Sequence, residues 1–130
     1  MDILQPAGWP QPRGYSNGIA ARGRQVFIAG MIGWDEQGRF HSDDFAAQAR
    51  QALKNVVCVL AEAGAKPEHI TRMTWYVTSR REYLEAGKAL GAAYREVIGR
   101  HFPVMTAVEV SALMEERAKV EIEVTAVVPD

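Results

Sequence analysis

The sequence has a single cysteine, Cys58, and no long uninterrupted apolar run in its 130 residues. One cysteine cannot form a disulfide within the chain, which is consistent with a reducing compartment. The apolar runs are far shorter than the ~20 residues that a membrane-spanning helix needs. The first residues also show neither the basic start nor the apolar centre of a secretion signal. We therefore expect a cytoplasmic protein that has no membrane partner.

Segments with a strong excess of one charge are also missing. The 15 Lys and Arg residues nearly balance the 16 Asp and Glu residues, so the formal net charge is -1. A nucleic-acid-binding surface normally needs clustered basic residues, and the sequence therefore favours no nucleic-acid partner. A chain of this length buries roughly two thirds of its unfolded surface. We expect a single domain over residues 1–130, with the proline-containing residues 1–12 as an extended N-terminal arm.

Motifs for metal ions and cofactors are scarce. His41, His69 and His101 lie in separate segments, and Cys58 has no second cysteine near it. Zinc sites normally draw on such residues at short, regular spacing. The chain also lacks the glycine-rich phosphate loop, the dinucleotide-binding motif and the nucleophile elbow. We therefore expect no metal and no cofactor, and we interpret Cys58 as a thiol without a catalytic role.

Two amphipathic helices are indicated by apolar residues at spacings of three, four and seven. The first should begin near 42–44, where side-chain oxygens can accept hydrogen bonds from free backbone N–H groups, and end at Gly64. The second should begin at Ser79, which forms a capping-box pattern with Glu82, and continue to about Ile98.

Strands are indicated by side chains that alternate between apolar and polar. They are expected at 15–21, 25–29, shortly after Gly30, and at 69–78, 105–112 and 119–128. We expect the first two to form one hairpin and the last two to form another. The helices can serve as right-handed crossovers between parallel strands. This order predicts an α+β fold, in which a six-stranded mixed β-sheet carries two α-helices packed on one face.

The sheet face without helices should be apolar. Its expected side chains are Val104, Met105, Ala107, Val127 and either Trp75 or Tyr76. A face of this composition is disfavoured in water and favours association with other subunits.

Four motifs stand in a fixed order along the chain. They are Arg13-Gly14-Tyr15-Ser16, Val26-Phe27-Ile28-Ala29-Gly30, Phe102-Pro103 followed by Ala107-Val108-Glu109-Val110, and the run from Lys119 to Val127. This ordered set resembles the Rid (YjgF/YER057c/UK114) family, the enamine/imine deaminases, over nearly the whole chain. The resemblance implies a chorismate mutase-like, YjgF-like fold. It also implies a homotrimer that binds a small-molecule ligand in a cleft at each subunit boundary.

The resemblance further implies which residues form the site. Glu121 matches a glutamate that is thought to act through water at the imine, and Tyr15 matches a tyrosine that lines the cleft. Gly30 matches a glycine whose backbone meets the ligand, and Met105 and Ala107 occupy the substrate-binding positions after the Phe-Pro pair. Three of them have a purely structural alternative: Glu121 could lie on a solvated strand face, Tyr15 could begin a strand and Gly30 could end one.

Met105 departs from the family pattern. Deaminating members usually have an arginine at this position that binds the substrate carboxylate, and a thioether cannot provide the same N–H donors. We therefore expect imine or enamine hydrolysis on a less anionic substrate than the usual 2-imino acids. Arg13 or Arg72 could also replace the missing arginine. Two alternatives stay open, namely a non-catalytic ligand-binding or regulatory trimer and a ribonuclease-type translation inhibitor.

Overall fold

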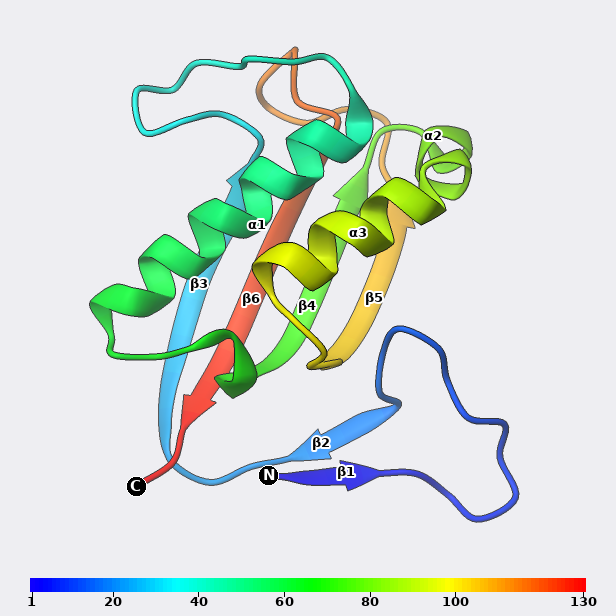
Figure 1. Cartoon of the computed structure of the whole chain (residues 1–130), viewed down its shortest axis with the longest axis vertical. Coiled ribbons are helices and arrows are strands. Elements are labelled where there is room, and N and C mark those ends of the chain that lie inside the picture. Colours follow the sequence, from blue (N-terminus) through cyan, green and yellow to red (C-terminus); the bar gives the residue numbers. More distant parts are fainter.

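The computed structural model of the protein describes all residues from Met1 to Asp130. The elements in chain order are β1 (Asp2–Leu4), β2 (Gly18–Ala20), β3 (Arg24–Ile32), α1 (Phe45–Glu62), the short 3-10 helix η1 (Pro67–His69), β4 (Ile70–Val77), α2 (Arg80–Glu85), α3 (Gly87–Val97), β5 (Val104–Glu109) and β6 (Val120–Val128). Helices α1 and α3 lie side by side across one face of a mixed sheet (Figure 1). The predicted α+β fold with helices on one face is therefore confirmed.

The six strands belong to two sheets rather than to one. The main sheet has four strands in the order β3-β6-β4-β5, and β1 pairs with β2 in a separate ribbon. In the main sheet, β4 and β5 are parallel, and the other two pairs are antiparallel. The backbone changes course at Gly23, whose φ is 144°, and a Cβ there would lie 2.0 Å from the Val128 carbonyl oxygen. This turn directs β2 away from β3. The prediction of one six-stranded sheet was therefore wrong, because the chain forms a four-stranded sheet and a separate two-stranded ribbon.

Neither predicted hairpin is present. β2 pairs with β1, so the arm expected at 1–12 begins with a strand, and β4 lies between β5 and β6. The connection after β5 crosses the end of β4, where Val110 N–H donates to Val77 O at 2.8 Å and Thr78 N–H donates to Lys119 O at 3.1 Å. Because the chain crosses there, β6 lies on the side of β4 opposite to β5. It pairs with β4 along one edge and with β3 along the other.

Helix α1 has the ends that the sequence predicts. Ala47 N–H donates to the Asp44 carboxylate at 2.9 Å, and Gly64 follows the helix with a φ of 68°. The buried residues of this helix are Phe45, Gln48, Ala49, Ala52, Leu53, Val56 and Leu60. The apolar members fall at the spacings of three, four and seven residues that predicted the helix, and Gln48 is the one polar addition.

Gln48 connects three segments of the chain. Its amide nitrogen donates to Ser42 O and to Arg117 O, both at 3.0 Å. Its amide oxygen accepts from Lys119 N–H at 2.8 Å. These bonds hold the chain that enters β6 against the first turn of α1, so Gln48 stabilises the crossover described above.

The second predicted helix is divided into α2 and α3 at Ala86. Glu82 N–H donates to Ser79 Oγ at 3.1 Å, which confirms Ser79 as the cap. The Glu82 carboxylate does not complete the predicted capping box, because it accepts from Lys119 Nζ at 2.9 Å. Gly87 then begins α3, which runs in a different direction from α2 (Figure 1).

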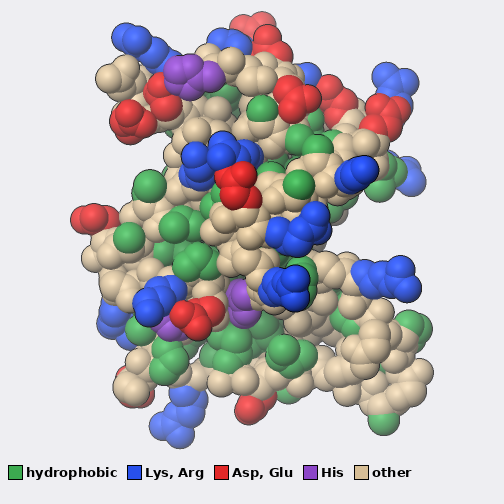
Figure 2. All heavy atoms as spheres, in the orientation of Figure 1, with side chains coloured by type: hydrophobic (Ala, Val, Ile, Leu, Met, Phe, Trp, Pro, Cys, Tyr) green, Lys and Arg blue, Asp and Glu red, His purple; other side chains and the backbone are tan.

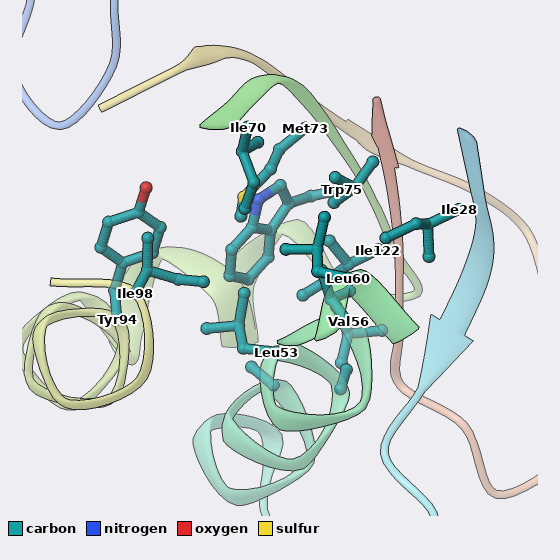
Figure 3. Close-up of a cluster of buried hydrophobic side chains, with 14 of the residues drawn as sticks. Ile28, Leu53, Val56, Leu60, Ile70, Met73, Trp75, Tyr94, Ile98 and Ile122 are labelled. Carbon is teal, nitrogen blue, oxygen red and sulfur yellow. The ribbon is translucent and has the colours of Figure 1, made fainter. Parts of the chain in front are cut away.

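The hydrophobic core lies between the helices and the main sheet. Figure 3 shows part of it, with Leu53, Val56 and Leu60 from α1, Tyr94 from α3, and Ile28, Met73, Trp75 and Ile122 from the strands. Burying each such aliphatic side chain contributes about 1.5–3 kcal/mol. None of the helices combines the length and the apolar composition that crossing a membrane requires.

Candidate functional site

A hollow of ≈ 630 Å³ lies between the edge strand β5 and the helices α2 and α3. Most of its lining is apolar or aromatic, and three of the five predicted site residues, Tyr15, Met105 and Ala107, belong to it. The volume is within the range of about 300–1,000 Å³ that is typical of small-molecule sites. The hollow is therefore the candidate ligand site of one chain.

Met105 and Ala107 face the helices. In the parallel register of β4 and β5, Met105 pairs with Met73 and Ala107 pairs with Trp75. Met73 and Trp75 are both buried in the core beneath the helices. The sequence-based placement of Met105 and Ala107 on the helix-free face was therefore wrong, and of the two alternatives Trp75 and Tyr76 it is Tyr76 that lies on that face. Alternation shows which side chains share a face, but only packing decides which face the helices cover.

Tyr15 is held over the hollow by its neighbour Ser16. Ser16 N–H donates to Pro103 O at 3.0 Å, and Ser16 Oγ donates to Phe102 O at 2.6 Å. Ser16 also forms an isolated parallel bridge with Val104, the first residue of β5. These bonds attach the segment 13–16 to the edge of the sheet, so a buried serine that the sequence analysis did not single out positions Tyr15.

Trp75 forms part of the inner wall of the hollow. Its side chain is only 6% exposed, and the Tyr83 ring lies edge-on to it at 6.3 Å. The indole nitrogen of Trp75 is buried and has no hydrogen-bond partner. Buried donors are nearly always paired in proteins, so an unpaired one at the wall of a hollow is unusual.

Tyr94 and Phe102 form another part of the wall. Their rings stack with centroids 6.0 Å apart and planes 10° apart, and the Tyr94 hydroxyl donates to His101 O at 2.6 Å. Burial raises the pKa of the Tyr94 hydroxyl far above its usual value. Tyr94 is therefore a neutral structural donor rather than an acid or base.

Glu121 and Gly30 lie together on the helix-free face of the sheet. A Cβ on Gly30 would lie 2.2 Å from Glu121 Oε2. Gly30 falls where the register of β3 and β6 shifts, and its φ is not positive. A glycine is needed here because the Glu121 carboxylate packs against the backbone, and not because of left-handed backbone conformation.

Glu123 lies on the same face, one row along β6. Its carboxylate accepts a hydrogen bond from the Tyr76 hydroxyl at 3.3 Å. The negative charge of Glu123 raises the pKa of Tyr76, with smaller contributions from burial and from Glu121. Glu123 is thus paired with a tyrosine, whereas Glu121 has no hydrogen-bond partner in the chain and rests against Gly30.

The predicted site residues are therefore divided between two faces. Tyr15, Met105 and Ala107 line the hollow, and Glu121 and Gly30 lie on the other side of the sheet. A ligand in the hollow does not contact Glu121 of the same chain.

Three arginines are relevant to the carboxylate-binding role that Met105 cannot fill. Arg72 pairs in register with Val104 and lies on the helix-free face, so it is not part of the hollow. Arg13 does line the hollow, and so does Arg95 of α3, which the sequence analysis missed. Its spacing of four residues from Gly91, which places the two residues on one face of the helix, was the available signal.

Other reactive side chains lie elsewhere. Cys58 is exposed on α1, in a second hollow whose lining contains no histidine. No group of three or more His, Cys, Asp or Glu side chains comes together in the structure.

The architecture and the hollow define a class of protein, namely an α+β protein with a ligand-sized hollow beside the edge strand of its mixed sheet. The family model described as endoribonuclease L-PSP matches residues 10–128. A RutC family protein of Synechocystis sp. is 33% identical over 132 residues, covering 99% of this chain and 98% of the relative. A 2-iminobutanoate/2-iminopropanoate deaminase of Salmonella typhimurium is 32% identical over 108 residues, covering 81% of this chain and 80% of the relative.

Solved structures agree with these relationships. A Rid family protein of Yersinia pestis, YyfB, aligns with a TM-score of 0.83 at 28% identity over 98% of each chain. Rv2704 of Mycobacterium tuberculosis, from the YjgF/YER057c/UK114 family, aligns with a TM-score of 0.66 at 34% identity, covering 89% of this chain and 88% of that one. The chain therefore belongs to the Rid (YjgF/YER057c/UK114) family, as the motifs predicted.

Proposed function

We propose that this protein hydrolyses an enamine or imine to a carbonyl compound and ammonia, without a cofactor, in a site formed by two copies of the chain. The observation that carries the proposal is the division of the site residues between two faces of the sheet. The hollow supplies a binding surface with Tyr15, and the helix-free face supplies the carboxylate of Glu121. A relative that is 32% identical bears the name 2-iminobutanoate/2-iminopropanoate deaminase, which supports this reaction class.

We infer a homotrimer, in which the hollow of one chain meets the helix-free face of the next. That face bears apolar side chains in the open, since Phe27 is 72% exposed and Val108 is 41% exposed in the isolated chain. Contact with another copy would remove these side chains from water, which is favourable by roughly 25 cal/mol for each Å² of apolar surface. The same contact would bring the two halves of the site together.

The reaction needs only water and proton transfers. Water adds to the C=N carbon and one of its protons passes to the nitrogen. The hydroxyl proton of the resulting carbinolamine then passes to the nitrogen as the C–N bond breaks, C=O forms and ammonia leaves. An enamine first becomes the imine when a proton moves from its nitrogen to its β-carbon. We assign to Glu121 the positioning of this water and the transfer of its proton. Tyr15 is assigned a hydrogen bond to the substrate or to the water, which holds the reacting atoms together.

Met105 directs the proposal away from the usual 2-imino acids. Its side chain packs partly against the core and presents a thioether to the hollow. Loss of one partner of a buried charge pair costs roughly 2–5 kcal/mol, and each 1.4 kcal/mol changes affinity tenfold. We therefore propose a substrate whose part next to Met105 is uncharged.

Two measurements test this function. Light scattering coupled to gel filtration should give the mass of three 14.4 kDa chains. Ammonia release should then be measured on a panel of freshly generated imines, some with and some without a carboxylate next to the C=N bond. A monomer at micromolar concentration would contradict the shared site.

The two alternatives give different results in the same experiments. A trimer that binds a ligand but releases no ammonia from any imine would support the non-catalytic, regulatory function. The description of the family model as an endoribonuclease calls for an RNA control. RNA binding that weakens steeply with salt would favour the ribonuclease-type alternative, because contacts with phosphates release counterions.

A further inference from the structure

Two arginines and several aromatic rings of the hollow have no role in the proposed reaction. We propose that the ligand of the hollow is an aromatic carboxylate, whose ring lies between α3 and β5 and whose carboxylate binds Arg95 and Arg13 at the mouth. This inference rests on the proposed function in one respect only, because the hollow is taken as the half of the site that holds the substrate.

The interior of the hollow suits a flat apolar group. Trp75, Tyr83, Tyr94 and Phe102 contribute aromatic rings to its wall. A Cβ added to Gly87 would meet no atom within 4 Å, so this glycine leaves open space beside the rings. Aromatic rings favour offset or edge-on packing against one another, and a planar ligand can enter such an arrangement.

The mouth of the hollow favours a negative charge. Arg13 and Arg95 are both exposed, and neither forms an ion pair within the chain. The lining residues of the same chain include no Asp or Glu that would neutralise them, and the one carboxylate that the shared site adds, Glu121 of another copy, is assigned to the reacting water. In Figure 2 the surface is indented at its right edge, and Lys and Arg side chains gather around this indentation. An anionic ligand group is therefore complementary to the mouth.

Arg95 is the better positioned of the two. Its guanidinium nitrogen Nη1 lies 3.2 Å from the place that a Cβ of Gly91 would occupy, so it rests along α3 over this glycine. A guanidinium offers two parallel N–H donors, which match the two oxygens of a carboxylate. The carboxylate would thus bind at the mouth and not beside Met105.

The test is isothermal titration calorimetry of the intact protein with three probes. Phenylacetate has both a ring and a carboxylate, phenylacetamide has the ring without the charge, and acetate has the charge without the ring. Phenylacetate should bind about tenfold or more tightly than phenylacetamide, which is the usual worth of one charge-assisted hydrogen-bond pair. It should also bind more tightly than acetate, because its ring removes apolar surface from water. Equal binding of phenylacetate and phenylacetamide would overturn the proposal.

Three variants locate the binding. Arg95→Gln should weaken phenylacetate binding about tenfold, with a smaller effect for Arg13→Gln. Arg22→Gln removes an exposed arginine that lies outside the hollow and should leave the affinity unchanged. Gly87→Leu should abolish binding while the melting temperature is retained, because a side chain there enters empty space and leucine favours a helix.

The outcomes separate this inference from the proposed function. Calorimetry needs no turnover, so phenylacetate binding without any ammonia release would contradict the hydrolase and leave the ligand class intact. Ammonia release together with no phenylacetate binding, even at millimolar concentration, would overturn the ligand class and indicate that another copy of the chain fills the hollow. Equal affinities of Arg95→Gln and Arg22→Gln would also overturn it.

Discussion

The two faces of the main sheet have opposite chemical character, although the same strands form both. On β4, Trp75 lies in the wall of the apolar hollow, and the next residue, Tyr76, pairs in register with Glu121 on the other face. The helix side thus provides aromatic rings with arginines at the mouth, and the helix-free side provides carboxylates. A single strand can serve both because successive side chains point in opposite directions.

In the proposed mechanism neither face holds a complete site by itself. The hollow has no carboxylate in its lining, and Glu121 lies on the helix-free face outside the hollow. The comparison therefore predicts that substitutions on the two faces will affect different steps, with binding on the helix side and proton transfer on the other side.

The largest effect is expected for Glu121→Gln. This change keeps the shape and the hydrogen-bonding capacity but removes the titrating proton, so ammonia release should fall by about 100-fold or more, the usual worth of a general acid or base. Glu123→Gln is the matched control on the same face, because Glu123 is paired with Tyr76. Equal activity of wild type and Glu121→Gln, with the trimer intact, would show that Glu121 is only a surface residue.

The next largest effect on activity is expected for Met105→Arg on the helix side of the sheet. The guanidinium can extend into the hollow while its methylene stem replaces that of methionine. The kcat/KM for small 2-imino acids should rise by roughly one to three decades. Met105→Leu keeps an apolar side chain of similar volume without the N–H donors, and it should give no such gain. Wild-type activity that already equals that of an arginine-bearing relative would argue against a specificity role for Met105.

A smaller effect is expected for Gly30→Ala. The new Cβ would lie 2.2 Å from Glu121 Oε2, so the carboxylate must move, and we expect activity to fall about tenfold. A double-mutant cycle of Gly30→Ala with Glu121→Gln shows whether the loss of activity acts through Glu121. Gly30→Ala should cost nothing further in the Glu121→Gln background, and a full additional loss there would mean that Gly30 acts independently of Glu121.

The smallest effect is expected for Asp35→Asn, which lies outside both faces. Backbone N–H donation from Arg39, followed by the hydrogen bond from His41 at 2.6 Å, lowers the pKa of Asp35 below 3.8. A lowered folded-state pKa means that Asp35 stabilises the fold above pH 3.8 and that this contribution disappears as the pH falls through the lower value. The melting temperatures of wild type and Asp35→Asn should therefore differ slightly at neutral pH and converge in acid. A difference that is constant with pH would contradict this.

The sequence was informative wherever local geometry decides the outcome. The cap at Asp44, the end of α1 at Gly64 and the cap at Ser79 were all predicted, because each depends on hydrogen bonds within one or two turns. The ordered motifs also predicted the family.

Strand order could not be predicted in the same way. The short connection between β5 and β6 favoured a hairpin, but Gln48 and the backbone bonds at Val77 and Thr78 lead the chain across the end of β4. These contacts join residues that are far apart in the sequence, and no local pattern encodes them. The placement of Met105 and Ala107 beneath the helices was missed for the same reason.

By itself, therefore, the sequence determined the helices, the alternation of the strands and the family, because periodicity, capping and ordered motifs act locally along the chain. Only the tertiary structure decided which face the helices cover, that Ser16 fastens Tyr15 over the hollow, and that Arg95 lies at its mouth. The physical reason is that these features depend on long-range packing and crossover geometry, which bring together side chains that no spacing rule relates.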